Sequence, residues 1–261
     1  FYSMGYTVSG ITLNGTDAAN YYLSGGSNSL TGSDGVITAA ALKITTSDVN
    51  KTYDRSLGAQ GVAQATQGTQ LFGSDALSGG TFAFTNWNAG AGNKVVTVSG
   101  VTLNDGNGGA NYVVSYVDNT TSTINKANLS ITGVTATDRT YNGLTTVALD
   151  ATNATISGAV SGDTVGVQSI GSGAMADKNA GTGKTVSFIT SGSGAYVLNG
   201  TDAGNYQLVT SGNGPLTVNI AKADITAISG LTAADKIYDK TTSATLTTGA
   251  AVFAGKLNGD V

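Results

Sequence analysis

The stretch Val197–Tyr206, "VLNGTDAGNY", decides how the chain is organised, because it occurs in three versions. The others are "TLNGTDAANY", which ends at Tyr21, and "TLNDGNGGANY", which ends at Tyr112. The three final tyrosines lie 91 and 94 residues apart. Recurrence at a nearly fixed period is the sequence signature of a tandem repeat.

Two further signatures keep the same register as the first. "KTYD", "RTYN" and "KIYD" contain Tyr53, Tyr141 and Tyr238, which lie 88 and 97 residues apart. Each of these tyrosines is followed 22 residues later by the aspartate of a "GSD", "SGD" or "NGD" tripeptide, namely Asp75, Asp163 and Asp260. We therefore expect one scaffold, repeated along the chain.

The register of these signatures divides the chain into four parts. We expect the C-terminal part of one repeat at 1–42, complete repeats at 43–128 and 129–222, and the N-terminal part of a further repeat at 223–261. A complete repeat of roughly 90 residues has the size of a small β-sandwich. Because the pattern is already under way at Phe1, we expect the chain to be a piece of a longer protein.

The composition favours short strands joined by tight turns. Gly occurs 38 times and Pro once, and alternating Val, Ile and Thr runs are bounded by Gly, Asn and Asp. We predict strands at Lys94–Leu103, Lys184–Gly192 and Tyr112–Val117, and no helix longer than one turn. The predicted fold is all-β, a tandem array of small Ig-like β-sandwich repeats forming an elongated rod. The alternative is a β-grasp-like unit, which would contain one real helix.

The joins between repeats also look like strands. Ser122–Val134 and Leu216–Ile228 are strand-like throughout, and no Gly/Ser- or Pro-rich linker separates the repeats. Pro215 stands at a strand start, where its missing donor does little harm. We therefore expect stiff joints between successive repeats.

Missing residue types exclude most catalytic chemistry. The chain contains no Cys, no His and no Glu, so it has no imidazole base, no thiolate nucleophile and no Cys/His zinc site. Charged residues make up only 11% and the net charge is −4, so no basic stripe for nucleic acid exists. No apolar run is long enough to cross a membrane. We expect no enzyme activity, no cofactor, no metal and no membrane insertion of this segment.

Two segments resemble ligand-binding motifs. "GTGKT" at 181–185 resembles the end of a P-loop, but Lys178 stands where the first Gly is required and the following residues read as strand. We interpret this segment as a Gly-rich connection between strands. "NDGNGGAN" at 104–111 is rich in oxygen ligands for Ca²⁺, but the other copies have a single carboxylate each. We predict a turn there.

The aromatic residues are the remaining site candidates. Trp87 stands where the next repeat has Lys178, so we expect it to be exposed and to be a candidate contact for a glycan or a partner. We predict structural roles for the six signature tyrosines, Tyr53, Tyr141, Tyr238, Tyr21, Tyr112 and Tyr206. The last three should fill the core and bond a nearby carbonyl, as a tyrosine corner does. The residue after each of the first three suits a turn: Asp54, Asn142 and Asp239.

The ordered motifs resemble a known family. "RTYNGLTT", "SGD", "ADKNAGTGKTV", "LNGTDAGNYQL" and "IAKADI" within 129–222 are similar to the YDG-type repeats, related to MBG-type repeats, of large bacterial surface adhesins. These adhesins include filamentous-haemagglutinin-like proteins exported by two-partner secretion. The repeat at 43–128 departs from the pattern with "KTYDRS" and "NWNAGAGNK". The resemblance implies an extracellular location, on the bacterial cell surface or in a secreted matrix, and it brings no catalytic residues.

Three functions are compatible with these features. The first is a structural stalk or spacer of an adhesin or surface filament, involved in adhesion and biofilm. The second is a carbohydrate-binding array that uses Trp87. The third is a self-assembling extracellular filament or matrix subunit, in which exposed sheet edges pair. The partners expected are surface or matrix polysaccharide, or neighbouring copies of the chain, and not nucleic acid.

Overall fold

A computed structural model describes residues 2–24 and 28–260. The chain divides into two compact units, Phe1–Asn125 and Lys126–Val261, which are described separately. The described residues form strands, turns and three-residue 3-10 helices, with no α-helix among them. The all-β prediction is confirmed, and the helix that a β-grasp-like unit would need does not occur in the described part of the chain.

The first unit begins with a two-stranded hairpin, which we call the leading segment (2–37). Its strands β1 (Tyr2–Val8) and β2 (Leu30–Ile37) pair antiparallel, from Tyr2 opposite Ile37 to Val8 opposite Leu30. The 3-10 helix η1 (Ala18–Asn20) is the single turn expected before Tyr21. No further strand pairs with either edge of this hairpin among the described residues.

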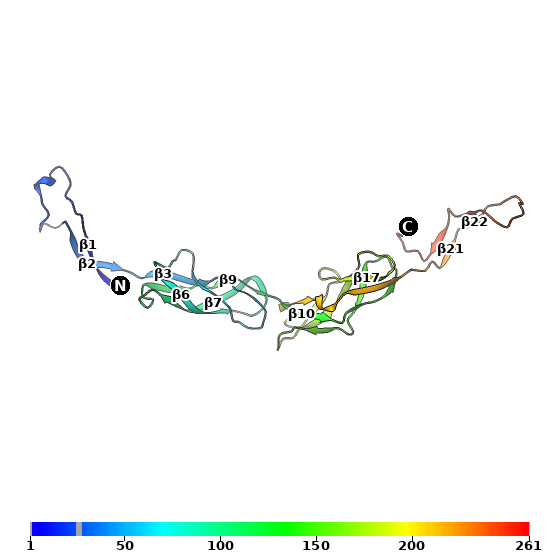
Figure 1. The fold of residues 1–261 in the computed structure, drawn as a ribbon, viewed down its shortest axis with the longest axis horizontal. Coiled ribbons are helices and arrows are strands. Elements are labelled where there is room, and N and C mark those ends of the chain that lie inside the picture. Colours follow the sequence, from blue (N-terminus) through cyan, green and yellow to red (C-terminus); the bar gives the residue numbers. More distant parts are fainter. Residues whose placement is uncertain (1, 25–27, 261) are drawn as a thin grey trace. The chain divides into compact units, whose positions relative to one another are not determined.

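The rest of the first unit is a complete repeat, which we call repeat 1. Its strands are β3 (Ala40–Thr46), β4 (Asn50–Thr52), β5 (Ala63–Ala65), β6 (Ala76–Phe84), β7 (Gly90–Asn104), β8 (Tyr112–Tyr116) and β9 (Asn119–Asn125). They form one sheet in the order β4-β9-β7-β6 and another in the order β5-β3-β8. Figure 1 labels β3, β6, β7 and β9 of this repeat. The β3–β8 and β4–β9 pairs are parallel, so strands from the two ends of the repeat lie side by side.

The core of repeat 1 lies between its two sheets. Strand β3 alternates between buried and more exposed positions, which places Leu42 and Ile44 on the inner face. These residues cluster with Tyr112 from β8 and with Val98 from the other sheet. Apolar side chains from both sheets therefore share one core.

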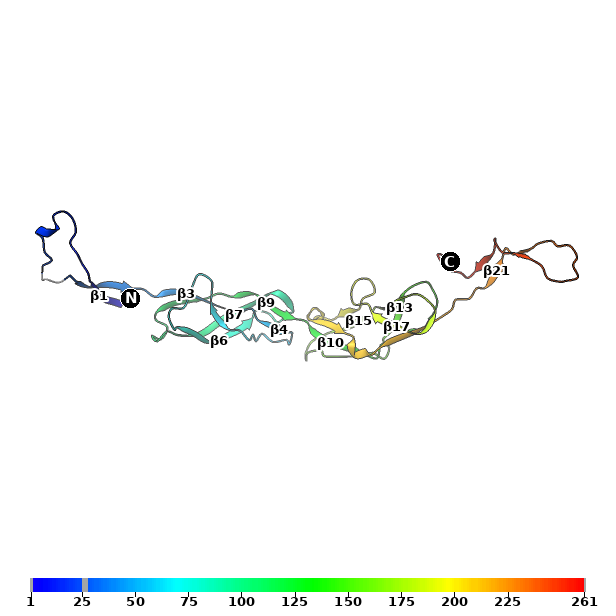
Figure 2. The ribbon, with the colours of Figure 1, turned by 45° about the horizontal axis from the view of Figure 1, so that its top comes forward.

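The second unit begins with another complete repeat, repeat 2. Its elements are β10 (Ala127–Thr132), β11 (Thr135–Ala136), β12 (Arg139–Thr140), β13 (Thr146–Asp150), β14 (Thr155–Ser157), β15 (Gly166–Ser169), β16 (Ser172–Ala174), β17 (Gly181–Phe188), β18 (Val197–Asn199), η2 (Ala203–Asn205), β19 (Tyr206–Val209), η3 (Ser211–Asn213) and β20 (Leu216–Ala221). The sheets have the orders β11-β13-β16-β17-β20-β12, β14-β10-β19 and β15-β18. Figure 2 labels β10, β13, β15 and β17 of this repeat. Leu129, Ile131, Val218 and Ile220 are buried on β10 and β20, again at alternate positions.

The second unit ends with a partial repeat, which we call the trailing segment (222–260). It contains β21 (Ala227–Ser229), β22 (Thr232–Ala233), β23 (Leu246–Thr247) and β24 (Val252–Ala254). These strands form two separate antiparallel pairs, β21–β24 and β22–β23.

Several predicted strands need adjustment. The strands predicted at Lys94–Leu103 and Tyr112–Val117 are β7 and β8, whereas the one predicted at Lys184–Gly192 ends earlier, at Phe188. The segment "GTGKT" forms the start of β17, and not a connection between strands. The first strand of each complete repeat begins at Ala40 or Ala127, slightly before the boundaries expected at 43 and 129.

The two joins differ from each other. In Ser122–Val134, only Lys126 separates the end of β9 from the start of β10. In Leu216–Ile228, the strand β20 ends at Ala221 and β21 begins at Ala227. The prediction of uninterrupted strands is therefore wrong at Lys126 and at residues 133–134 in the first join, and at residues 222–226 in the second. Pro215 directly precedes β20, as predicted.

Candidate functional site

The "KTYD" signature forms a turn that is closed by its own lysine. The Asp54 carboxylate accepts a hydrogen bond from the backbone N–H of Ser56 at 2.9 Å, which is the predicted turn. The Lys51 ammonium reaches over this turn and donates to the same carboxylate at 2.7 Å and to the Ser56 carbonyl at 2.8 Å. The turn was expected from the sequence, but the part played by the cation was not.

The same arrangement recurs with different residues. In repeat 2, Arg139 donates to the Asn142 side chain and to the Leu144 carbonyl. In the trailing segment, Lys236 donates to Asp239 at 2.8 Å and to the Thr241 carbonyl at 2.9 Å. A cation three residues before an Asp or Asn is therefore a structural element of every copy in which this signature is seen.

The tyrosine of the "VLNGTDAGNY" signature and the aspartate of the "SGD" signature contact each other inside each complete repeat. Tyr206 is buried, and its hydroxyl donates to the Asp163 carboxylate at 2.5 Å and accepts the backbone N–H of Val160 at 2.9 Å. Burial, and then the hydrogen bond to Asp163, raise the pKa of Tyr206 above its usual range. The tyrosine fills the core, but its predicted carbonyl partner is wrong, because the acceptor is a carboxylate.

Repeat 1 contains the same pair. Tyr112 is buried and donates to Asp75 at 2.6 Å while accepting the N–H of Phe72 at 2.8 Å. Burial and the hydrogen bond to Asp75 raise its pKa as well. In both complete repeats, the aspartate of the "GSD" or "SGD" tripeptide is therefore the hydrogen-bond acceptor of the core tyrosine.

The third aspartate has a different partner, because the trailing segment carries no tyrosine of the Tyr206 type. The Tyr141 hydroxyl donates to Asp260 at 2.9 Å, and the Lys178 ammonium lies 2.8 Å from the same oxygen. The Lys178 nitrogen also lies 5.8 Å from the centroid of the Tyr141 ring. This three-residue contact fastens the end of the trailing segment to repeat 2.

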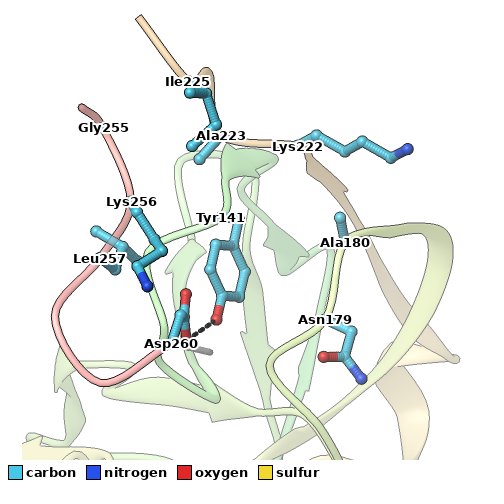
Figure 3. Close-up of a pocket in the computed structure, with 10 residues that line it drawn as sticks. All are labelled: Tyr141, Asn179, Ala180, Lys222, Ala223, Ile225, Gly255, Lys256, Leu257 and Asp260. Carbon is cyan, nitrogen blue, oxygen red and sulfur yellow. Dashed lines mark hydrogen bonds between the residues drawn. The ribbon is translucent and has the colours of Figure 1, made fainter. Parts of the chain in front are cut away.

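The contact lies in a pocket of about 390 Å³ between repeat 2 and the trailing segment. Figure 3 shows the Tyr141 hydroxyl directed at Asp260, with Leu257 of the trailing segment on one side and Asn179 of repeat 2 on the other. Its remaining lining residues are Ala180, Lys222, Ala223, Ile225, Gly255 and Lys256. The lining combines one paired carboxylate with apolar side chains, two lysines and one asparagine, and it contains no second acid.

Comparison with known protein families identifies the repeats. A YDG domain is matched at residues 38–122 and again at 125–213, which together exceed half of the chain. The chain belongs to the YDG domain family. Both YDG domains contain one Tyr–Asp pair of the kind described above. Comparison with curated proteins and with solved structures gave no significant match.

The remaining tyrosines differ in their surroundings. In the YDG domain of repeat 1, Tyr53 is buried, and its N–H donates to the Asn125 carbonyl at 2.8 Å. Tyr141 is half-buried in repeat 2. Tyr21 and Tyr238, which lie outside both YDG domains, are exposed. The same signature residue is thus buried or half-buried inside a YDG domain and exposed outside one.

Trp87 lies after β6 in the first YDG domain and is exposed, whereas Lys178 at the equivalent position of the second is half-buried. Lys178 contacts the trailing segment through Asp260. A role of Trp87 in binding a glycan or a partner stays a prediction.

The two segments that resemble ligand-binding motifs, "GTGKT" and "NDGNGGAN", are bonded to other residues of the YDG domains. In "GTGKT", the Lys184 ammonium lies 2.5 Å from Asp177, and the N–H of Gly183 donates to the Asn219 side chain at 2.9 Å. The segment is a strand and presents no helix N-terminus to a phosphate. Its lysine and its central amide are therefore bonded within the protein.

In "NDGNGGAN", the Asp105 carboxylate accepts backbone N–H groups from Asn107, Gly109 and Asn111. The hydrogen bond from Gly109, followed by the others, lowers the pKa of Asp105. The segment is the predicted turn. Across the described residues, no three acidic side chains gather as metal ligands would. No helix of the described part is long and apolar enough to cross a membrane.

The contact at Asp260 should depend on pH. The hydrogen bonds from Lys178 and then Tyr141 lower the pKa of Asp260 below its ordinary value of 3.8. A depressed pKa in the folded state means that the contact stabilises above the ordinary value and is lost as the pH falls through the folded value. We expect the Tyr141 ring signals in NMR spectra to be constant near neutral pH and to shift below pH 3.8.

Two variants control this measurement. Asp260→Asn should abolish the shift of the Tyr141 signals. Asp239→Asn should leave it in place, because Asp239 bonds Lys236 of the same segment and not repeat 2. A shift that survives Asp260→Asn would contradict the assignment.

Proposed function

We propose that this chain is a structural stalk or spacer segment of an extracellular bacterial adhesin or surface filament. Its YDG domains act as small sandwich-like modules of a stiff rod that holds a distal binding region away from the cell. The observation that carries the proposal is that the recurring polar residues hold each repeat together. A residue that is buried and paired within its own repeat is not available for a ligand or substrate.

The Tyr–Asp pairs illustrate this internal use of polar groups. Tyr112 and Tyr206 each make two hydrogen bonds that join distant parts of one repeat. Such bonds are stronger than neutral ones because the acceptor is charged. They stabilise a module in which charged side chains are scarce, since only 11% of residues are charged.

The joint between the repeats supports a spacer. One residue, Lys126, separates β9 of repeat 1 from β10 of repeat 2. A single residue has few rotatable bonds, whereas a long Gly/Ser linker behaves as a random coil. A short joint of this kind favours a fixed spacing between successive modules.

The stiffness of the joint can be measured by electron–electron distance measurements. The chain contains no Cys, so Thr102→Cys and Thr217→Cys place one spin label on the exposed face of each complete repeat. We expect one narrow distance distribution between the labels. An insertion of Gly-Gly-Ser after Lys126 should broaden it.

The same insertion between Asn107 and Gly108, in a surface turn of repeat 1, is the control and should leave the distribution narrow. A distribution that is already broad in the unmodified chain would argue against a stiff spacer. The extracellular location has its own test: antibodies against the repeats should label intact cells of the source bacterium.

A further inference from the structure

Strand β8 is an uncovered edge inside repeat 1. It lies at one end of the sheet β5-β3-β8, and among the described residues it pairs with β3 alone. The other edge strands of this repeat are shorter or partly covered. Strands β4 and β5 have three residues each, and β6 exchanges backbone hydrogen bonds with Leu57 and Ala59. An edge strand presents a row of N–H and C=O groups with which another strand can pair.

The outward backbone groups of β8 belong to Val114 and Tyr116. The Val117 N–H donates to the Ile44 carbonyl of β3 at 2.8 Å, so every second residue counted back from Val117 faces β3. The residues between them face the open side of the strand. Within the described part of the chain, no hydrogen bond reaches the backbone N–H or C=O of Val114.

Repeat 2 closes the same edge with a tyrosine. Leu208 of β19 corresponds to Val114, since each lies two residues after the signature tyrosine of its repeat. The Leu208 N–H donates to the Tyr196 hydroxyl at 3.3 Å. Tyr196 lies between β17 and β18, whereas the corresponding part of repeat 1 is the continuous strand β7. The edge group that is bonded in repeat 2 is therefore open in repeat 1.

The side chains of the two edges differ in the same way. Val114 is 38% exposed, whereas Leu208 is 7% exposed. Val113 is 63% exposed, and repeat 2 has at this position Gln207, whose amide donates to the Asn128 side chain at 2.8 Å. Strand β8 contains no charged residue and no Pro, the residue types that commonly protect an edge. A second uncharged strand can therefore approach β8 without like-charge repulsion.

The free backbone groups of β8 are complementary to themselves. In an antiparallel pair of two β8 strands centred on Val114, this residue exchanges both of its backbone hydrogen bonds with its counterpart. The Tyr116 N–H of each copy then faces the Tyr112 carbonyl of the other copy. The Tyr112 N–H already donates to the Gly109 carbonyl at 3.2 Å, so no backbone donor on this edge is left without an acceptor.

We propose that two copies of this chain pair through the β8 edges of their first YDG domains, in an antiparallel and twofold-symmetric manner. The pairing joins the two β5-β3-β8 sheets into one continuous sheet and covers Val114 and Tyr116. Such a contact closes after two copies, which distinguishes it from open-ended pairing of sheet edges. It goes beyond the proposed spacer, since a spacer needs no partner, and either proposal can fail without the other.

Sedimentation equilibrium of the full chain tests the association. We expect a weak dimer, because β8 has only five residues. The weight-average mass should rise from 25.9 kDa towards twice that value as the concentration increases. Val114→Pro removes the outward N–H and keeps the bonds to β3, so it should weaken dimerisation at least about 10-fold.

The matched control is Val113→Gln, which introduces the residue of repeat 2 at the neighbouring position of the same strand. Val113 faces β3 with its backbone and solvent with its side chain, so dimerisation should change by less than about 3-fold. Circular dichroism should show both variants folded.

A disulfide test reads the register of the pairing. The chain contains no Cys, so single cysteines can be introduced. In the proposed dimer the two Val114 Cα atoms lie about 5.5 Å apart, within the disulfide range. The two Val113 Cα atoms lie about 7–8 Å apart, beyond that range. Oxidised glutathione should therefore link the copies of Val114→Cys and leave those of Val113→Cys unlinked, although Val113 is the more exposed residue.

Three results would overturn the proposal. The first is a mass that stays at 25.9 kDa at every concentration. The second is dimerisation of Val114→Pro as strong as that of the unmodified chain. The third is equal cross-linking of Val114→Cys and Val113→Cys, which would mean that the copies meet only by collision.

Discussion

Replacing Tyr206 by alanine is expected to lower the free energy of unfolding of repeat 2 by about 3–5 kcal/mol, the usual cost of truncating a buried aromatic residue. The ring fills the core, and its hydroxyl joins Asp163 to the N–H of Val160. Loss of the side chain leaves a cavity and removes both bonds. We expect each of the two compact units to unfold in its own transition, so urea denaturation followed by circular dichroism measures the change.

Two related variants separate the causes of this effect. Tyr206→Phe keeps the ring and should cost about 1.5–3 kcal/mol, the range for a hydrogen bond to a charged group. Tyr21→Ala removes the same signature residue from an exposed position, so the transitions of both repeats should change by less than about 0.5 kcal/mol. Equal destabilisation by Tyr206→Ala and Tyr21→Ala would mean that the Tyr–Asp pair does not stabilise the repeat.

Replacing Gly200 by alanine is the second change with a large expected effect, about 2–5 kcal/mol. Gly200 has a φ of +102°, which L-residues rarely adopt, and its Cβ would lie 2.2 Å from the Thr164 carbonyl oxygen. The two backbones must separate, although the N–H of Asp202 donates to that same carbonyl. We expect the urea midpoint of repeat 2 to fall, while that of repeat 1 stays constant.

Gly183→Ala is the control for the φ angle alone. Gly183 has a φ of +61°, and a Cβ there would meet nothing within 4 Å. Its expected cost is about 1–2 kcal/mol, from the left-handed backbone without a clash. If Gly200→Ala costs no more than Gly183→Ala, the close approach to Thr164 does not matter for stability.

Much of the local structure follows from sequence pattern. Alternation identified β7 and β8, and the single helical turn before Tyr206 is the 3-10 helix η2. The Asx-type turn at Asp54 followed from the residue type alone. These predictions are confirmed because each local structure is decided by residues that lie close together in the sequence.

Predictions that needed distant partners were less successful. Lys184–Gly192 was expected to be one strand, but β17 pairs with β20 only as far as Val186 and ends at Phe188, its last residue paired with β16. The strand expected across Leu216–Ile228 is interrupted for a similar reason, since β20 pairs within repeat 2 and β21 pairs with β24 of the trailing segment. Strand length depends on the partner strand, which periodicity does not reveal.

The sequence by itself determined the repeat period, its three register-locked markers, the all-β class and the absence of Cys, His and Glu. It did not reveal that two of the markers bond each other. Tyr112 and Asp75 are 37 residues apart, whereas Tyr206 and Asp163 are 43 apart, because the repeats differ in loop length. Only the tertiary structure decided this pairing and the parallel pairing of strands from the two ends of each complete repeat. Both depend on contacts between strands distant in the chain, and a hydrogen bond across a core is set by where the backbone returns, not by a fixed spacing.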